Sequence, residues 1–196
     1  MSTVLTHMTM SLDGFIADPT DGIEELFGWY GAGSVTVPTA SADMPPFSVD
    51  DASAELLRGY LANGGALVAG RRLFDITNGW GDNHPMGVPV VVVTHQPPDD
   101  ADQWPRTTFV GDVPTAIEKA KDIAGDKTVT IASANIAAQA LDLGLVDEVH
   151  VSLVPVLLGE GIPYFAGLTG APHRLEDPVV TPGKRATHLQ YTVKRG

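Results

Sequence analysis

The stretch Ala66-Leu67-Val68-Ala69-Gly70-Arg71-Arg72-Leu73-Phe74-Asp75 joins an apolar run to a segment with helical spacing. Apolar residues that end at a glycine predict a short buried strand, and a helix is predicted to begin after Gly70. An earlier helix is predicted from Asp51, because cap-type residues precede it and apolar residues recur at helical spacing as far as Asn63-Gly64-Gly65. Helix, strand and helix in succession indicate an α/β fold.

The same alternation runs through the rest of the chain. Strands are predicted over residues 4–12, 88–93, 107–110, 128–131, 147–158 and 187–193, and helices over residues 112–123 and 133–144. The last strand is expected to pair antiparallel near an edge. We therefore expect one domain, residues 1–196, with a mostly parallel central sheet, helices on both faces and antiparallel C-terminal strands.

Residues 18–47 contain many turn residues and no hydrophobic periodicity. They are predicted to form a long loop with one short helical turn at residues 23–29. Loops of this length are often functional. This one carries Phe27, Trp29 and Tyr30, which either bind a ligand or cover the edge of the core, and the sequence leaves both interpretations open.

The composition excludes several classes of function. The chain has 196 residues with 24 acidic and 12 basic side chains, a net charge of −12, which argues against nucleic acid or an anionic membrane surface as a partner. It has no cysteine, which excludes a disulfide framework, a thiol nucleophile and a thiolate metal site. No signal peptide or membrane-spanning run is visible, so a cytoplasmic location is expected.

Common catalytic fingerprints are also missing. No G-x-G-x-x-G follows a strand, and G-x-x-x-x-G-K-[ST], H-E-x-x-H and G-x-S-x-G do not occur. The six histidines show no pair with metal-ligand spacing on one helix, so no metal site is predicted.

Polar and glycine residues follow three of the predicted strands, at Gly70-Arg71-Arg72, Thr94-His95-Gln96 and Ala132-Ser133-Ala134-Asn135. Ligands of α/β sheets collect at the carboxyl ends of strands, and the N–H groups that open a helix bind phosphate without a net positive charge. Arginine adds planar donors that match phosphate oxygens. Each turn alone is typical of an ordinary cap, but together they favour a phosphorylated ligand, above all a dinucleotide.

Four segments in order resemble a known family. They are residues 10–17 (MSLDGFIA), residues 70–75 (GRRLFD), residues 132–136 (ASANI), and residues 144–148 (GLVDE) continuing to 155–161 (PVLLGEG). In this order they resemble the C-terminal reductase domain of bacterial riboflavin biosynthesis proteins. The resemblance extends from about residue 3 to residue 193, and it implies the dihydrofolate reductase-like fold, a three-layer α/β sandwich.

The resemblance implies NADPH as the cofactor. The turn at Thr94 would meet the adenosine 2′-phosphate, the helix start at Ser133 would meet the pyrophosphate, and Ile16 and Ala17 would flank the nicotinamide. The cofactor residues that it implies are Ile16, Ala17, Gly70, Arg71, Arg72, Thr94, His95, Ser133, Ala134, Asn135, Ile136, Gly159 and Gly161, the two last glycines allowing close backbone approach.

The resemblance also places Asp13 at the substrate, where it is the best acidic candidate for a catalytic role. Alternatively, the carboxylate of Asp13 only holds its turn, because Asp-Gly after a strand is a common turn sequence. Phe27 or Trp29 would stack on the substrate ring. The family commonly forms dimers, and the strand at residues 149–158 is a candidate edge for a homodimer.

Two departures from the family pattern bear on the substrate. Ala132-Ser133 stands where the family usually has a Gly-Gly pair, and Ile131 stands where the authentic pyrimidine reductases have a glutamate. An apolar residue cannot shuttle a proton. With no deaminase half present either, the chain is expected to be a stand-alone relative whose substrate is a pterin, dihydrofolate or another conjugated heterocycle.

Three functions remain open at this point. The first is an NADPH-dependent reductase that transfers hydride to a pterin-, folate- or aminopyrimidine-like heterocycle. The second is a nucleotide-binding dimeric scaffold without turnover, which Ile131 favours. The third is a pterin or flavin binder without redox chemistry.

Overall fold

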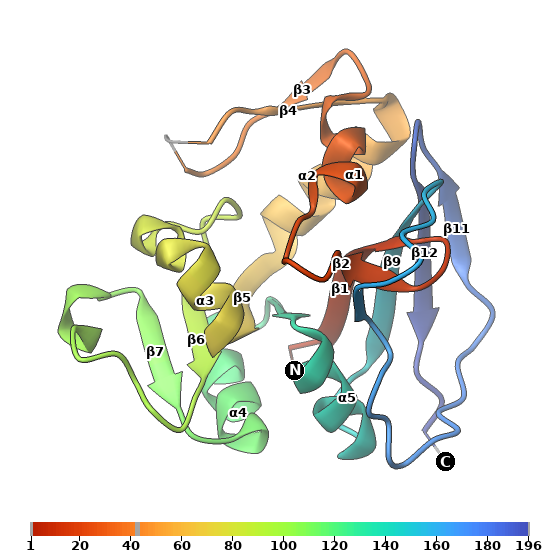
Figure 1. The fold of residues 1–196 in the computed structure, drawn as a ribbon. Helices are drawn as coiled ribbons and strands as arrows, with labels where there is room; N and C mark the ends of the chain where they lie inside the picture. The colour runs from red at the N-terminus through yellow and green to blue at the C-terminus, as the bar shows by residue number, and fades with distance from the viewer. Residues whose placement is uncertain (1, 42–43, 196) are drawn as a thin grey trace.

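The computed structural model describes residues 2–41 and 44–195. Within this part of the chain, a central sheet of eight strands has the order β11-β12-β9-β1-β8-β5-β6-β7 (Figure 1). The parallel strands are β1 (Val4–Ser11), β5 (Gly64–Gly70), β6 (Val90–Val93), β7 (Thr107–Val110), β8 (Thr128–Ala132) and β9 (Glu148–Val154). The strands β11 (Val179–Pro182) and β12 (Thr187–Thr192) add an antiparallel C-terminal part, which confirms the predicted sheet.

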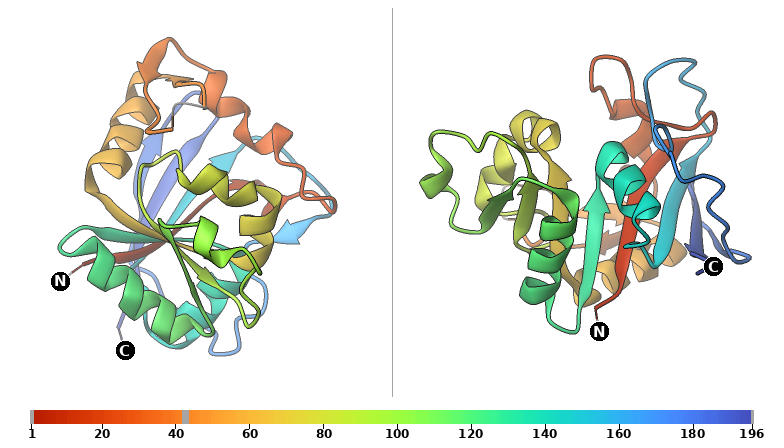
Figure 2. Two further views of the ribbon diagram at one scale, coloured as in Figure 1. Left: turned by 90° about the vertical axis from the view of Figure 1, so that its left-hand side faces the viewer. Right: turned by 90° about the horizontal axis from the view of Figure 1, so that it is seen from below.

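Helices cover both faces of the sheet, as the views in Figure 1 and Figure 2 show. One face carries α1 (Glu24–Phe27), α2 (Asp51–Asn63) and α3 (Arg71–Ile76), and the other carries α4 (Val113–Ala124) and α5 (Ala134–Asp142). Three short 3₁₀ turns are η1 (Gly28–Gly31), η2 (Asn78–Asp82) and η3 (Ala101–Gln103). The predicted α/β three-layer sandwich is therefore confirmed.

Strand alternation divides the core between the two faces. Val68, Val129 and Ile131 are fully buried in the cluster that includes the apolar sides of α4 and α5. Leu67 and Ala69, one residue out of phase, pack with Phe74 of α3 on the opposite face. The helices begin where the sequence predicts, since Asp50 caps α2 and Asp112 caps α4 through side-chain hydrogen bonds to backbone N–H groups.

Two expectations about the chain between these elements need correction. The loop predicted at residues 18–47 contains β3 (Val35–Val37), which pairs with β4 (Phe47–Val49), and strands of three residues are too short to give a periodic signal. The strand expected to reach residue 158 ends at Val154, because Pro155 has no N–H group to continue the ladder.

The prediction that the strand at residues 149–158 is an edge strand, available to a homodimer, is wrong. Strand β9 lies inside the sheet and pairs with β1 on one side and β12 on the other. The edge strands of the described sheet are β7 and β11, and the weak alternation of β11 left it unrecognised. A second, two-stranded sheet pairs β2 (Phe15–Ala17) with β10 (Ile162–Pro163).

Candidate functional site

The carboxyl ends of β5, β6 and β8 lie side by side, so the sheet brings together the three turns that the sequence singled out. Gly70 pairs with Val93 in the ladder, and Ala69 pairs with Ala132. A side chain added at Gly70 would come within 3.4 Å of the Ser133 hydroxyl, which shows how closely two of the turns pack.

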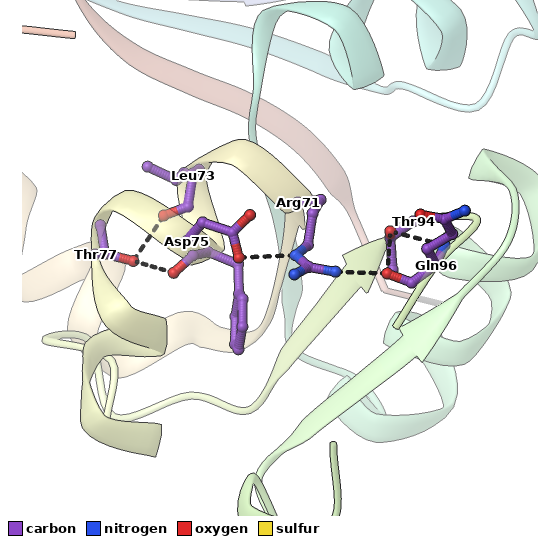
Figure 3. Close-up of polar contacts among 7 residues, drawn as sticks. Arg71, Leu73, Asp75, Thr77, Thr94 and Gln96 are labelled. Atoms are coloured by element: carbon purple, nitrogen blue, oxygen red, sulfur yellow. Dashed lines mark hydrogen bonds and ion pairs between the residues drawn. The ribbon is translucent and has the colours of Figure 1, made fainter. Parts of the chain in front are cut away.

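Arg71 links the β5 turn to the β6 turn (Figure 3). Its Nε donates to Asp75 Oδ1 at 2.7 Å, and its guanidinium also donates to the carbonyl oxygen of Gln96. The Thr94 hydroxyl donates to that same carbonyl at 3.0 Å and accepts from the Gln96 N–H at 3.2 Å. The side chain of Arg71 keeps about 35% of its surface exposed, so these contacts orient it without closing it off from an anion.

The turn at Ser133 opens α5. Ser133 has an extended backbone and makes no side-chain hydrogen bond to the first turn of the helix. The first N–H groups of a helix have no partners within it, so those of Ala134 and Asn135 are suited to phosphate oxygens. Ile136 is buried in the core and offers only its backbone.

Arg72 and His95 do not join this cluster of contacts. The guanidinium of Arg72 forms a bidentate ion pair with Asp21, from Nη2 to Oδ2 at 2.7 Å and from Nε to Oδ1 at 3.0 Å. This ion pair raises the pKa of Arg72. His95 is exposed and lies near enough to Asp112 to help lower the pKa of that carboxyl, after the stronger hydrogen bonds from Thr115.

Asp13 lies in the turn after β1 and accepts three hydrogen bonds. They come from Ser11 Oγ at 2.6 Å, Gly159 N at 2.7 Å and Leu158 N at 3.1 Å. These hydrogen bonds, that from Ser11 first, lower the pKa of Asp13. A carboxylate held in its ionised form is a poor proton donor, so this geometry favours the interpretation in which Asp13 holds its turn against residues 158–159.

The close approach expected at Gly161 is made within the chain. Gly161 has φ +149°, and a Cβ there would lie 2.2 Å from the carbonyl oxygen of Ala17. Ile16 and Ala17 are both buried, with 8% and 7% of their surfaces exposed. Gly159 has φ +77° and open space where a Cβ would stand.

A cavity of about 430 Å³ lies between the sheet and the layer of helices α1, α2 and α3. This volume is in the range of small-molecule sites. Its lining includes Leu73, three residues from the Gly70 turn, and Ala132, which directly precedes Ser133. The cavity thus borders two of the three turns. Its apolar walls include Leu5, Ile23, Phe27, Met44, Phe47, Leu57, Leu67, Trp80, Met86 and Val88.

No side chain that lines the cavity in the described part of the chain is an Asp, Glu, Lys or Arg. Its titratable members are two histidines and two tyrosines. Burial, assisted by the neighbouring His150 and His188, lowers the pKa of His7 to about 3, and burial lowers the pKa of His84 to about 4. Both rings are therefore neutral at neutral pH, and the cavity suits an uncharged, flat ligand.

A left-handed turn forms one wall. Asn78, Trp80 and Asp82 have φ of 48°, 52° and 59°, in a region that residues with a side chain rarely occupy. Trp80 contacts His84 edge to face, with their ring centroids 4.7 Å apart. Strained backbone of this kind is often found at ligand clamps.

The two aromatic residues predicted at the substrate have different places. Phe27 lines the cavity. Trp29 is 1% exposed, donates to the Thr9 hydroxyl at 3.2 Å and lies outside the lining, so it belongs to the core. No sequence motif pointed to His7 or Tyr60, although the alternation of Leu5, His7 and Thr9 along the first strand places all three on the cavity face.

Ile131 has less bearing on function than the sequence suggested. It is fully buried on the face of β8 that packs against α4 and α5, whereas its neighbours Thr130 and Ala132 line the cavity. The absence of a carboxylate at position 131 therefore does not remove a group from the cavity.

Solved structures place this architecture in the dihydrofolate reductase-like class. Dihydrofolate reductase from Enterococcus faecalis, complexed with NADP(H) and RAB-propyl, aligns at a TM-score of 0.59 and 13% identity, over 98% of this chain and 97% of that one. The chain belongs to the RibD C-terminal domain family, whose sequence pattern matches residues 2–184. The family that the sequence resembles is thus confirmed.

Two further structures are similar. A protein from Shewanella sp. PV-4 assigned to riboflavin biosynthesis has a TM-score of 0.67 and 22% identity, covering 98% of this chain and 99% of that one. The diaminohydroxyphosphoribosylaminopyrimidine deaminase/5-amino-6-(5-phosphoribosylamino)uracil reductase of Thermotoga maritima has a TM-score of 0.63 and 12% identity, and the match covers 98% of this chain but 57% of that one. A comparison with curated protein sequences found no match.

Among the described residues, no helix is long and apolar enough to cross a membrane. No group of three or more His, Asp or Glu side chains in those residues is arranged to hold a metal ion.

Proposed function

We propose that the protein is an NADPH-dependent reductase that transfers hydride to a C=N or C=O bond of a pterin-, folate- or aminopyrimidine-like heterocycle. The observation that carries this proposal is the arrangement of the turns and the cavity. Three turns with phosphate-binding chemistry lie side by side at the carboxyl edge of the sheet, and an uncharged cavity of about 430 Å³ borders two of them. The family supports the same conclusion, because one similar structure is a uracil-derivative reductase and another is a complex with NADP(H).

The donor set at the carboxyl edge fits the phosphates of NADPH. The guanidinium of Arg71 and the hydroxyl of Thr94 come from neighbouring turns and meet at the carbonyl oxygen of Gln96, and the first turn of α5 offers N–H groups that Ser133 does not cap. The Arg71 and Thr94 turns would hold the 2′-phosphate and the α5 turn the pyrophosphate. Bound there, the nicotinamide cofactor supplies a hydride.

The cavity is suited to hold the ring that accepts the hydride. Apolar walls exclude water, and Phe27 and Trp80 offer aromatic faces to a flat ring. Because Leu73, three residues after Gly70, and Ala132, at the end of β8, both line the cavity, a ring in the cavity would lie close to the turns proposed to hold the cofactor. Asp13 holds loop 158–159 in place and is not assigned the proton transfer.

The test begins with the cofactor alone. NADPH should raise the melting temperature of the protein, and NADH should raise it less, because NADH lacks the 2′-phosphate that the Arg71 and Thr94 turns would hold. Loss of NADPH absorbance is then followed with dihydropterin, dihydrofolate and aminopyrimidine substrates. Equal shifts with the two nucleotides, or none, would contradict the cofactor assignment.

The same assays test the alternative hypothesis, a nucleotide-binding scaffold without turnover. It predicts NADPH binding without oxidation by any heterocycle, and the observation that favoured it, Ile131, concerns the opposite face of the sheet. The homodimer, which the family resemblance implies, and the cytoplasmic location, which the sequence led us to expect, stay predictions. Sedimentation equilibrium would test the first.

A further inference from the structure

The face of β1, β9 and β12 that lies beneath α2 carries a row of polar side chains. His7 on β1 pairs across the ladder with His150 on β9, and Ser152 pairs with His188 on β12. Helix α2 places Ser53 and Tyr60 above them, seven residues apart and so on one side of the helix. Of these residues, His7 and Tyr60 line the cavity.

These side chains form a continuous chain of hydrogen bonds from the cavity to the start of α2. His7 Nε2 lies 3.0 Å from Ser152 Oγ, which lies 2.9 Å from His188 Nδ1. His188 Nε2 lies 3.0 Å from Ser53 Oγ, which donates to Asp50 Oδ2 at 2.7 Å. The chain therefore ends at Asp50, the cap residue of α2.

Asp50 fixes the direction of every hydrogen bond in this chain. Partial burial opposes its ionised form, but hydrogen bonds from Ser53 and the backbone of Lys184 lower its pKa to about 2. An ionised carboxylate only accepts, so the Ser53 hydroxyl must donate to it. With its single proton committed, Ser53 Oγ accepts from His188, which places the proton of that ring on Nε2.

The same logic continues to the cavity. Burial lowers the pKa of His188, so the ring is neutral and its Nδ1 carries no proton. Nδ1 accepts from the Ser152 hydroxyl, and Ser152 Oγ in turn accepts from His7 Nε2. The neutral ring of His7 is then protonated on Nε2 and bare on Nδ1. His7 remains partly accessible and lines the cavity, so this lone pair is available to a ligand.

A second, shorter chain has the same direction. His150 Nε2 lies 2.8 Å from Glu148 Oε2, and His150 Nδ1 lies 2.9 Å from the Tyr60 hydroxyl. Donation to the carboxylate leaves Nδ1 of His150 as an acceptor, so the Tyr60 hydroxyl donates to His150. The Tyr60 oxygen is then an acceptor, for the Gln190 side chain and for other donors. The rings of Tyr60 and His7 are 4.9 Å apart.

We propose that His7 and Tyr60 form a pair of hydrogen-bond acceptors at the cavity, and that this pair selects a planar heterocycle presenting ring N–H or amino groups. Asp50 and Glu148 hold the two residues in this acceptor state. That the ligand in the cavity is a heterocycle rests on the proposed reductase function. A ligand with only acceptors on that edge would leave a buried lone pair opposite its own, which costs more than a missing contact. His7 and Tyr60 are thus specificity-determining residues, and Asp50 and Glu148 are positioning residues.

The direction of the chain is tested without any ligand. Nitrogen-15 NMR of labelled histidine reports which ring nitrogen carries the proton, and we expect His7 and His188 to be protonated on Nε2. In Asp50→Asn, the amide oxygen can still cap α2 while the amide nitrogen donates to Ser53, at the cost of the hydrogen bond from the Lys184 N–H. This reverses the chain and moves the His7 proton to Nδ1. Protonation of His7 on Nδ1 in the wild type overturns the proposal.

Two variants accompany this measurement. Asp51→Asn removes a neighbouring exposed acid and should leave both tautomers as in the wild type. Ser152→Ala cuts the chain between the two rings, so His7 should lose its single tautomer while His188 keeps its proton on Nε2. A His7 tautomer that is unchanged in both Asp50→Asn and Ser152→Ala would show that the chain does not set it.

Recognition is tested with lumazine, a pteridine with lactam N–H groups, and its analogue with methyl groups on both lactam nitrogens. Fluorescence titration should give the wild type a preference for lumazine of about 10-fold or more. The preference should shrink in Asp50→Asn, where the steric effect of the methyl groups is unchanged. Equal binding of the two compounds, or a preference unaltered by Asp50→Asn, overturns the proposal. Failure to bind NADPH would instead count against the reductase function and leaves the tautomer result standing.

Discussion

The carboxyl edge of the sheet carries charged side chains, whereas the cavity beside it is lined by uncharged ones. At the edge, Arg71 and Arg72 each pair with an aspartate, and both side chains remain at least about a third exposed. In the cavity, no lining residue of the described chain carries a full charge, and burial keeps His7 and His84 neutral. The proposed function assigns the charged and backbone donors at the edge to phosphates, and the neutral groups in the cavity to a ring.

The largest expected effect comes from placing a carboxylate in each region. Leu57 is 3% exposed in the cavity wall, and Leu57→Asp should lower the free energy of unfolding by about 3–5 kcal/mol, because the new charge has no partner. Gln96→Asp, at the exposed edge, should change it by about 0.5 kcal/mol or less. Urea denaturation measures both, and equal small losses would show that water already fills the cavity wall.

A substitution at the carboxyl edge should weaken cofactor binding and leave the stability of the fold almost unchanged. Arg71→Ala should weaken NADPH binding by about 1.5–3 kcal/mol, roughly 10- to 150-fold, the range for a hydrogen bond to a charged group. Its exposed pair with Asp75 contributes about 1 kcal/mol or less, so the ligand-free protein should melt almost as the wild type does. Arg58→Ala, on the exposed side of α2, is the matched control. An unaltered NADPH dissociation constant with a lower melting temperature would make Arg71 a structural residue.

The cavity histidines should make the stability of the protein depend on pH. The pKa values of His7 and His84 are about 3 and about 4 in the folded protein, below the ordinary 6.5, so the unfolded chain binds more protons between these limits. Stability should therefore fall as pH drops below 6.5, by about 2 kcal/mol from each residue at about pH 5. His84→Gln should remove about 2 kcal/mol of this loss at about pH 5 in urea melts at several pH values. A loss of the same size in the variant would contradict a neutral, buried His84.

The smallest effect is expected at Asp13. Its pKa is lowered in the fold, so its hydrogen bonds stabilise the protein above its ordinary value of 3.8, and that contribution disappears as pH falls through the lowered value. Asp13→Asn should therefore be less stable than the wild type at neutral pH, with the gap closing in acid, while kcat/KM keeps the same pH profile. A loss of about 10²-fold or more in kcat/KM would restore Asp13 as the proton relay.

The sequence was most informative where structure is local. The turn after Gly70 and the helix starts at Asp112 and Ser133 each follow from neighbouring residues, and the structure contains them where they were predicted. Strand pairing of β3 with β4 was not predictable, because three-residue strands carry no period and their contacts are set by the rest of the fold.

The cavity was beyond sequence reasoning for a related reason. His7 and Tyr60 meet His150 only through the order of strands β1 and β9 and the crossing of α2, and these residues are up to 143 positions apart in the chain. Alternation could place His7 on a face but not say what covers it. For Asp13, the position after a strand suggested either chemistry or a turn, and only the structure shows the hydrogen bonds to residues 158 and 159 that favour the turn.

A crystal structure with NADPH bound tests the division between edge and cavity most directly. The account predicts the adenosine phosphates at Arg71, Thr94 and the start of α5, with the nicotinamide turned toward the cavity beside Leu73 and Ala132. Phosphates bound elsewhere, or a nicotinamide directed away from the cavity, would contradict it.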